Sequence, residues 1–440
     1  MKKGFLSLLL VCCSVLACKE TNTNNDSQAK LNALAAKYVR LGLTIGQYDA
    51  DFVDAYYGPD SLKPMVQPKA VFPKDSLLAA ANNLIGQLIE FNANEKNDTL
   101  AGRAKWMSSQ LIAFGRRINI FSQKYQLFDE ESKDLFGVIA PTYPESHYQA
   151  LVAKLDSLLP GQGSINARFE KLASQFIIPK AKVDTVFKTA IAEARKRTLQ
   201  HYQLPANENF TLEYVTGKPW SGYNWYQGNY QSKIQISIDL PIFIERAIDL
   251  ACHEGYPGHH VYNMLLEKNL YHDKGWVEIS LYPLFSPQSL IAEGSANYGI
   301  EIAFPGTEKN KFVKDVLLPL AGMDGKNTDL YFQALALKAQ LAYARNEVAR
   351  GIINNTMSET EVNKWLMNYG LREKNLAVKD INFIKKYRSY VINYNYGQDI
   401  VKKYIESNGG TAANANKRWE LFQWLLSNAV RPTDLIKAQQ

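Results

Sequence analysis

The stretch H-E-G-Y-P-G-H-H (residues 253–260) holds three of the six histidines of this 440-residue chain. Glu254 lies directly beside the first of them. Hydrolytic zinc sites combine neutral imidazole ligands with a carboxylate that takes a proton from zinc-bound water. The stretch is therefore a candidate Zn²⁺ site, with Glu254 as the candidate general base.

The spacing of these histidines departs from the common H-E-x-x-H pattern, in which both ligands lie one helical turn apart. His253 is six positions from His259 and seven from His260. On a straight helix, seven positions span about 10.5 Å, too far for two ligands of one zinc ion. Pro257 interrupts helical hydrogen bonds and Gly258 tolerates unusual backbone angles, so we expect a distorted helix. Either His259 or His260 can then be the second ligand.

A later segment, I-A-E-G-S-A-N-Y (residues 291–298), resembles the N-E-G-F-A-x-Y segment of gluzincin aminopeptidases. In those enzymes the glutamate binds zinc, so the resemblance implies that Glu293 is the third ligand. Asn297 follows Glu293 by one helical turn and is expected to orient a ligand histidine. Gly258-His259 also resembles the G-H of thimet-type motifs, which favours His259 as the second ligand.

Together the two segments resemble a large bacterial family of domains of unknown function, marked by H-E-A-Y-P-G-H-H and E-G-W-A-x-Y. That family is grouped with zincin-like peptidases and is related in fold to the carboxypeptidase Taq family. The likeness extends to residues 48–51 (Y-D-A-D), 56–59 (Y-Y-G-P) and 396–398 (Y-G-Q). Many members carry P-G-Q in the last of these stretches, and here Tyr396 stands in place of the proline. The resemblance implies Zn²⁺ as cofactor and the hydrolysis of peptides.

Hydrophobic periodicity predicts a mainly α fold with a small β-sheet. Residues 233–240 alternate strictly and predict a strand, preceded by a loop or hairpin at 220–228. Pro241 then suits the start of a helix that ends at the histidines. With the resemblance, this indicates one zincin-like (gluzincin) domain over residues 29–440, in two lobes around a cleft. Further helices are expected at residues 29–48, 77–91, 100–121, 183–202, 330–353 and 417–427, and a capping box at 358–361.

Other side chains are weaker candidates. The imidazole that does not bind zinc, expected to be that of His260, is predicted to contact substrate or to fix Glu254. Tyr394, with Tyr396 and Arg388, either packs in the fold or donates a hydrogen bond to the oxyanion of the reaction. The remaining residues, His147, His201, His272 and Cys252, are expected to be structural or, for the histidines, exposed.

The first residues predict export. Residues 1–17 have two lysines followed by an apolar stretch that is too short to span a bilayer, which is typical of a signal peptide. Residues 15–18 (V-L-A-C) look like a bacterial lipobox, so Cys18 is expected to carry lipid; a plain secretory signal is the alternative. Residues 18–28 predict a flexible tether. We expect a lipid-anchored protein of the cell envelope that faces the periplasm or the cell surface.

Two classes of function remain. With 50 Lys+Arg against 43 Asp+Glu, and no basic run, nucleic acid is not expected as a partner. One class is a zinc peptidase with a peptide substrate, which can add to the strand at 234–238 as a further strand. The other is a lipoprotein that binds peptide or metal without turnover. Glu254 favours the enzyme, because a binding protein has no need of a carboxylate beside its first ligand.

Overall fold

A computed structural model describes residues 6–218 and 220–438, with side chains from residue 26 onward except at position 375. The first helix, α1 (Leu6–Gly46), runs through residues 18–28, where the sequence predicts a flexible tether. The side chains of the predicted signal peptide and of Cys18 lie outside the described residues, so export and lipidation stay predictions. Among the described residues, no helix has both the length and the apolar character needed to span a bilayer.

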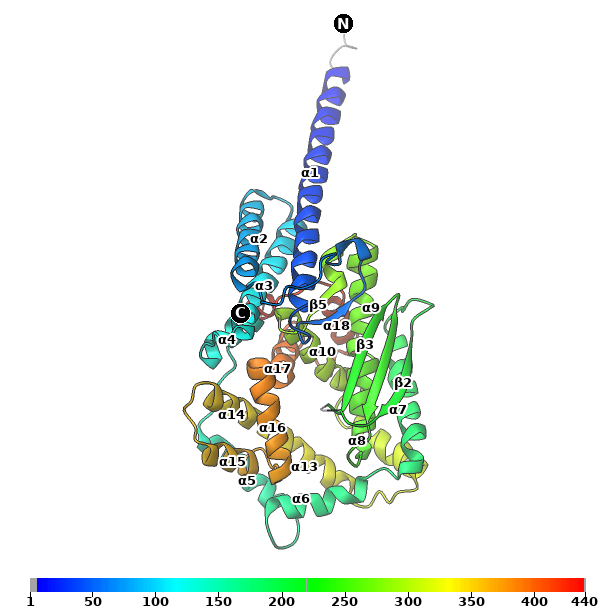
Figure 1. Cartoon of the computed structure of the whole chain (residues 1–440). Helices are drawn as coiled ribbons and strands as arrows, with labels where there is room; N and C mark the ends of the chain where they lie inside the picture. The colour runs from blue at the N-terminus through cyan, green and yellow to red at the C-terminus, as the bar shows by residue number, and fades with distance from the viewer. Residues whose placement is uncertain (1–5, 219, 439–440) are drawn as a thin grey trace.

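Most of the chain is helical, as predicted. α1 packs beside α2 (Lys74–Asn94) and α3 (Asp98–Phe121) (Figure 1). Between α1 and α3, the Tyr38 and Phe114 rings stack with their centres 5.0 Å apart. The capping box at Ser358 is present at the start of α15 (Glu359–Asn368). Further helices are α4 (Phe128–Phe136), α5 (Glu145–Leu158), α6 (Ile165–Ala173), α7 (Val183–Leu199), α11 (Glu308–Phe312), α12 (Leu318–Ala321), α18 (Ala415–Leu426) and α19 (Pro432–Lys437).

The long helix expected over residues 330–353 is two helices. α13 (Thr328–Gln340) and α14 (Ala344–Ile353) are joined by a 3₁₀ turn over Leu341–Tyr343. The apolar pattern continues through the turn, because the Leu341 and Ala344 side chains are both buried. Periodicity alone therefore does not reveal the interruption.

Two small sheets accompany the helices. β1 (Val53–Tyr56) pairs antiparallel with β5 (Leu281–Pro283). β2 (Asn209–Val215), β3 (Gly222–Gly228) and β4 (Gln231–Ser237) form the second sheet, in the order β2-β4-β3. β4 is the predicted strand, and it is central. The expectation that a peptide adds to residues 234–238 is therefore wrong, since β2 and β3 already occupy both edges of that strand.

The helix after β4 is interrupted, as its sequence predicts. α8 (Ile244–Leu250) passes into a π-helical turn (Ala251–Gly255), and α9 (His259–Leu266) begins only after a break at residues 256–258. At the break, a Cβ atom on Gly258 would lie 2.0 Å from the carbonyl oxygen of His253. Only glycine therefore fits this close approach of the chain to itself.

Helix α10 (Pro287–Ala303) carries the Glu293 segment and crosses α17 (Ile392–Ser407) at very close range. A Cβ atom on Gly294 would lie 2.3 Å from the carbonyl carbon of Gly397. A Cβ atom on Gly397 would likewise lie 2.7 Å from the carbonyl oxygen of Leu290, so both glycines are needed for the two backbones to meet. α16 (Lys374–Tyr387) and the turn Arg388–Val391 precede α17.

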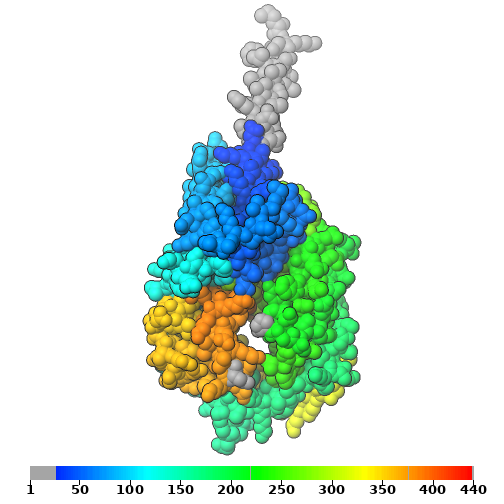
Figure 2. Space-filling model, viewed as in Figure 1, coloured from blue at the N-terminus to red at the C-terminus, as the bar shows by residue number. Residues whose placement is uncertain are grey.

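Figure 2 shows the molecule hollowed between the orange segment around α16 and α17 and the green segment that includes the strands. The arrangement in two lobes around a cleft stays a prediction.

Candidate metal centre

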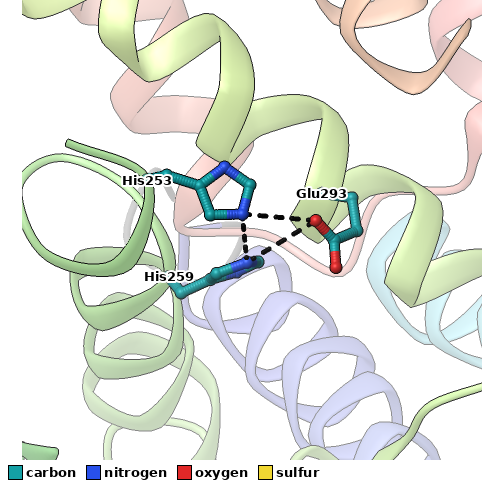
Figure 3. Close-up of side chains that lie close together, drawn as sticks. All are labelled: His253, His259 and Glu293. Atoms are coloured by element: carbon teal, nitrogen blue, oxygen red, sulfur yellow. Dashed lines mark hydrogen bonds and ion pairs between the residues drawn. The ribbon is translucent and has the colours of Figure 1, made fainter. Parts of the chain in front are cut away.

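Three of the predicted side chains meet at one point: His253, His259 and Glu293 (Figure 3). The Nε2 atoms of the two histidines lie 3.1 Å apart. Oε2 of Glu293 lies 3.4 Å from Nε2 of His253 and 3.7 Å from Nε2 of His259. His253 lies in the π-helical turn, His259 at the start of α9 and Glu293 in α10. The break before α9 thus brings together two histidines that a straight helix would hold apart.

These residues fit a zinc ion. Oε2 of Glu293 is buried and makes no hydrogen bond with the described residues. A buried carboxylate oxygen without a partner costs free energy unless a cation or a donor satisfies it. Two imidazoles and one glutamate are also a ligand set of hydrolytic zinc sites, which leave a further position open.

Asn297 holds one of the imidazoles in the orientation that metal binding requires. Nδ1 of His253 lies 2.9 Å from Oδ1 of Asn297, and Nδ2 of Asn297 donates to the carbonyl oxygen of Tyr394 at 2.7 Å. Because this second bond makes Oδ1 the acceptor, Nδ1 of His253 carries the proton. The lone pair of Nε2 then points at the cluster, and this is the contact expected of Asn297.

The carboxyl groups of the cluster differ in their electrostatics. Burial raises the pKa of Glu293, but contacts with His253 and His259 outweigh it and hold that pKa well below its usual range. Glu293 is therefore an anion, as a zinc ligand must be. Burial also raises the pKa of Glu254, and the same two imidazoles only partly oppose this shift. Glu254 is 4% exposed and is thus set to hold a proton more readily than a carboxyl group in water.

A cavity of about 360 Å³ opens onto the cluster and is lined by Glu254. Its walls are rich in aromatic side chains, and Tyr394 is one of them. Tyr390, one turn earlier, donates a hydrogen bond to Oε1 of Glu293 at 2.9 Å. Asp54 and Tyr223 reach the cavity from β1 and β3 and are hydrogen-bonded to each other. No local sequence pattern predicts these last three residues, although Asp54 lies between two of the stretches that carry the family resemblance.

His260 points away from the cluster, contrary to its predicted contact with substrate or Glu254. Its ring is fully buried, with Nε2 3.0 Å from Oε2 of Glu208 and Nδ1 2.8 Å from Oγ of Ser232. Glu208 also accepts hydrogen bonds from Tyr256 at 2.6 Å and from Arg195 at 2.6 Å. The reason is helical geometry, since adjacent residues of α9 point about 100° apart around its axis. We call Glu208, His260, Ser232, Tyr256 and Arg195 the buried histidine cluster.

The other candidates have structural partners. Arg388 forms an ion pair of 2.6 Å with the buried Glu131. His147 stacks on Tyr143, His201 stacks on Trp419, and His272 lies 3.1 Å from Glu267. Tyr396 is absent from the described cavity wall. The Cys252 thiol is fully buried, as expected.

Comparison with known proteins gives a likeness of fold. No family model and no curated protein matches the chain. A candidate lipoprotein from Colwellia psychrerythraea matches with a TM-score of 0.51 at 13% identity, over 83% of this chain and 69% of the other. A candidate lipoprotein of unknown function from Shewanella oneidensis has a TM-score of 0.48 at 13% identity, over 83% and 72%. The M32 carboxypeptidase from Deinococcus radiodurans R1 has a TM-score of 0.47 at 11% identity, over 94% and 95%. The first likeness indicates a shared fold, and at these identities none of the three indicates an activity.

Proposed function

We propose that this chain is a zinc-dependent peptidase. His253, His259 and Glu293 hold the ion, and Glu254 is the general base. The observation that carries the proposal is the buried Oε2 of Glu293, which makes no hydrogen bond with the described residues and faces two imidazole nitrogens in the wall of a cavity. Structural ion pairs do not need an open cavity, whereas a hydrolytic site does.

When bound, zinc supplies a Lewis acid that polarises a peptide carbonyl and acidifies water. The Glu254 carboxylate takes the proton of the attacking water and later passes it to the nitrogen of the leaving amine. Asn297 fixes the ring of His253, and the hydroxyl of Tyr390 fixes Glu293. Tyr394 lines the cavity, and its phenol would donate a hydrogen bond to the oxyanion of the reaction.

The test compares wild type with Glu254→Gln, measuring zinc content and peptide-library cleavage on the same samples. The variant should keep its zinc and lose roughly 10²- to 10⁴-fold in rate, because only the base is removed. Glu245→Gln is the matched control: Glu245 is a buried glutamate of α8 bonded to Tyr331, and its loss should leave turnover near wild type. Equal cleavage by Glu254→Gln and wild type would contradict the role of Glu254. A zinc-loaded wild type that cleaves no peptide would instead support the lipoprotein that binds peptide or metal.

We also propose that lipid on Cys18 anchors the protein in the cell envelope. The support is the lipobox-like sequence at residues 15–18. Cys18→Ser should move the protein from the membrane fraction to the soluble fraction, since the lipid would be its apolar anchor. Membrane retention equal to wild type would contradict this.

A further inference from the structure

We propose that Asp54 binds the free amino terminus of the peptide, so that the site cleaves near amino-terminal ends. This inference rests on the proposed peptidase function and names its substrate class. Asp54 is a carboxylate in the cavity wall that neither holds the metal nor acts as the base. The carboxylate of Asp54 is therefore free to contact a substrate in the cavity.

Asp54 lies at an irregularity of the antiparallel pairing between β1 and β5. Its neighbours Val53 and Ala55 lie opposite Pro283 and Tyr282, and Asp54 itself has no paired residue. The Tyr223 hydroxyl donates a hydrogen bond to Oδ1 of Asp54. This is the one hydrogen bond that the carboxylate makes with the described residues. A carboxylate accepts about four, so it can take further donors such as the three N–H groups of an ammonium.

The charges of the cavity wall favour a cation at this place. Four carboxyl groups line the cavity, against one lysine. Two of them, Glu254 and Glu293, serve the catalytic centre. Asp51 is paired with the lysine, Lys386, at 3.0 Å. Asp54 forms no ion pair with a lysine or arginine among the described residues, and a substrate ammonium would supply such a partner.

Asp54 also faces the same space as the catalytic centre, because Asp54, Glu254 and Glu293 line one cavity of about 360 Å³. A peptide bound in this cavity can therefore reach both. An amino terminus held there brings the first peptide bonds of the chain to the centre. A substrate carboxy terminus would meet the like charge of Asp54 and would find Lys386 already paired.

The experiment uses one pool of mixed-sequence pentapeptides in four forms: with free ends, with an acetylated amino terminus, with an amidated carboxy terminus, and with both blocked. Zinc-loaded wild type should lose roughly 10- to 100-fold in kcat/KM on acetylation, because a charge-assisted hydrogen bond is lost. Amidation should have little effect.

Variants then assign this preference to one residue. Asp54→Asn should lower kcat/KM for free-amine peptides by a similar factor, mainly through KM, and should leave the acetylated pool at its low rate. The preference for a free amine thus shrinks. Asp51→Asn, which changes the neighbouring carboxylate, should retain the preference. Zinc content and thermal midpoint show that each variant is folded and loaded.

Equal cleavage of free and acetylated pools by wild type would overturn the inference while leaving the peptidase function intact. So would a requirement for a free carboxy terminus that is lost in Lys386→Gln, which points to carboxy-terminal recognition. An unchanged amine preference in Asp54→Asn would also overturn it. If zinc-loaded wild type cleaves none of the four pools, the peptidase function itself is refuted, and the inference with it.

Discussion

His259 and His260 are neighbours in the chain, yet they lie in opposite environments. His259 faces the cavity, where its Nε2 atom lies 3.1 Å from that of His253 and near a carboxylate oxygen that has no hydrogen bond. His260 lies in the buried histidine cluster, where both of its ring nitrogens have partners. The first environment leaves ligand atoms open for an ion, whereas the second leaves nothing open.

The difference shows that a candidate metal ligand is identified by donor atoms that lack a hydrogen-bond partner, rather than by residue type. Both residues are histidines at the start of α9, and both lie near a glutamate. In the buried histidine cluster, Glu208 accepts hydrogen bonds that satisfy it, whereas Oε2 of Glu293 accepts none. The buried histidine cluster therefore stabilises the fold, whereas the ligand atoms of the proposed metal centre remain open.

The largest effect on stability should follow from His260→Ala. The variant loses a hydrogen bond to a carboxylate and one to a hydroxyl, so the free energy of unfolding should fall by about 3 kcal/mol. Arg195 still pairs with Glu208, which limits the loss. Urea unfolding measures the change. If His260→Ala loses zinc and keeps its stability, the assignment of a structural role to His260 and a metal-binding role to His259 is wrong.

Asn297→Ala should affect metal binding, because Asn297 orients His253. Removing such an outer partner typically weakens metal affinity roughly 10- to 100-fold. Competition with a chromophoric chelator measures it. An affinity equal to wild type would mean that the His253 ring is oriented by its surroundings alone.

Acid should weaken the buried histidine cluster before it unfolds the rest. Burial raises the pKa of Glu208, but bonds from His260, Tyr256 and Arg195 outweigh it and lower that pKa from 4.5 to about 2. A depressed folded-state pKa stabilises the fold above pH 4.5, and the stabilisation is lost as the pH falls toward 2. The stability difference between wild type and Glu208→Gln should therefore shrink across this range in urea titrations. A difference that does not vary with pH would contradict this role of Glu208.

The smallest effect is expected from Ser232→Ala. One neutral hydrogen bond to His260 is lost, so stability should fall by about 1 kcal/mol. Zinc affinity should equal that of wild type, which makes this variant the control for Asn297→Ala. A drop in zinc affinity here would show that the two environments are coupled.

The sequence predicted the parts of this site that local geometry determines. Glu293 and Asn297 share one helix, so a spacing of four residues places them together. The break at Pro257 and Gly258 was likewise predictable from the chemistry of those two residues. Local geometry left the choice between His259 and His260 open, because it depends on where α9 begins after the break, and a shift of one residue exchanges the two rings. Only the resemblance to thimet-type motifs favoured His259, the histidine that lies in the cluster.

The cavity-wall residues that come from distant segments of the chain could not be predicted from local sequence patterns either. Asp54 reaches the cavity on a strand of four residues that pairs with β5, more than 200 positions away in the chain. Tyr390 lies in a short turn before α17, and its place follows from the close crossing of α10 and α17. Neither arrangement has a signal in the neighbouring residues, since pairing and crossing join segments that are far apart in the chain.

The measurement that tests the central claim most directly is the zinc content of wild type, His259→Ala and His260→Ala, purified in parallel and analysed by mass spectrometry. We predict about one zinc ion per chain in wild type and in His260→Ala, and none in His259→Ala, because two remaining ligands hold zinc poorly. Zinc retained by His259→Ala and lost from His260→Ala would contradict this assignment of the metal centre.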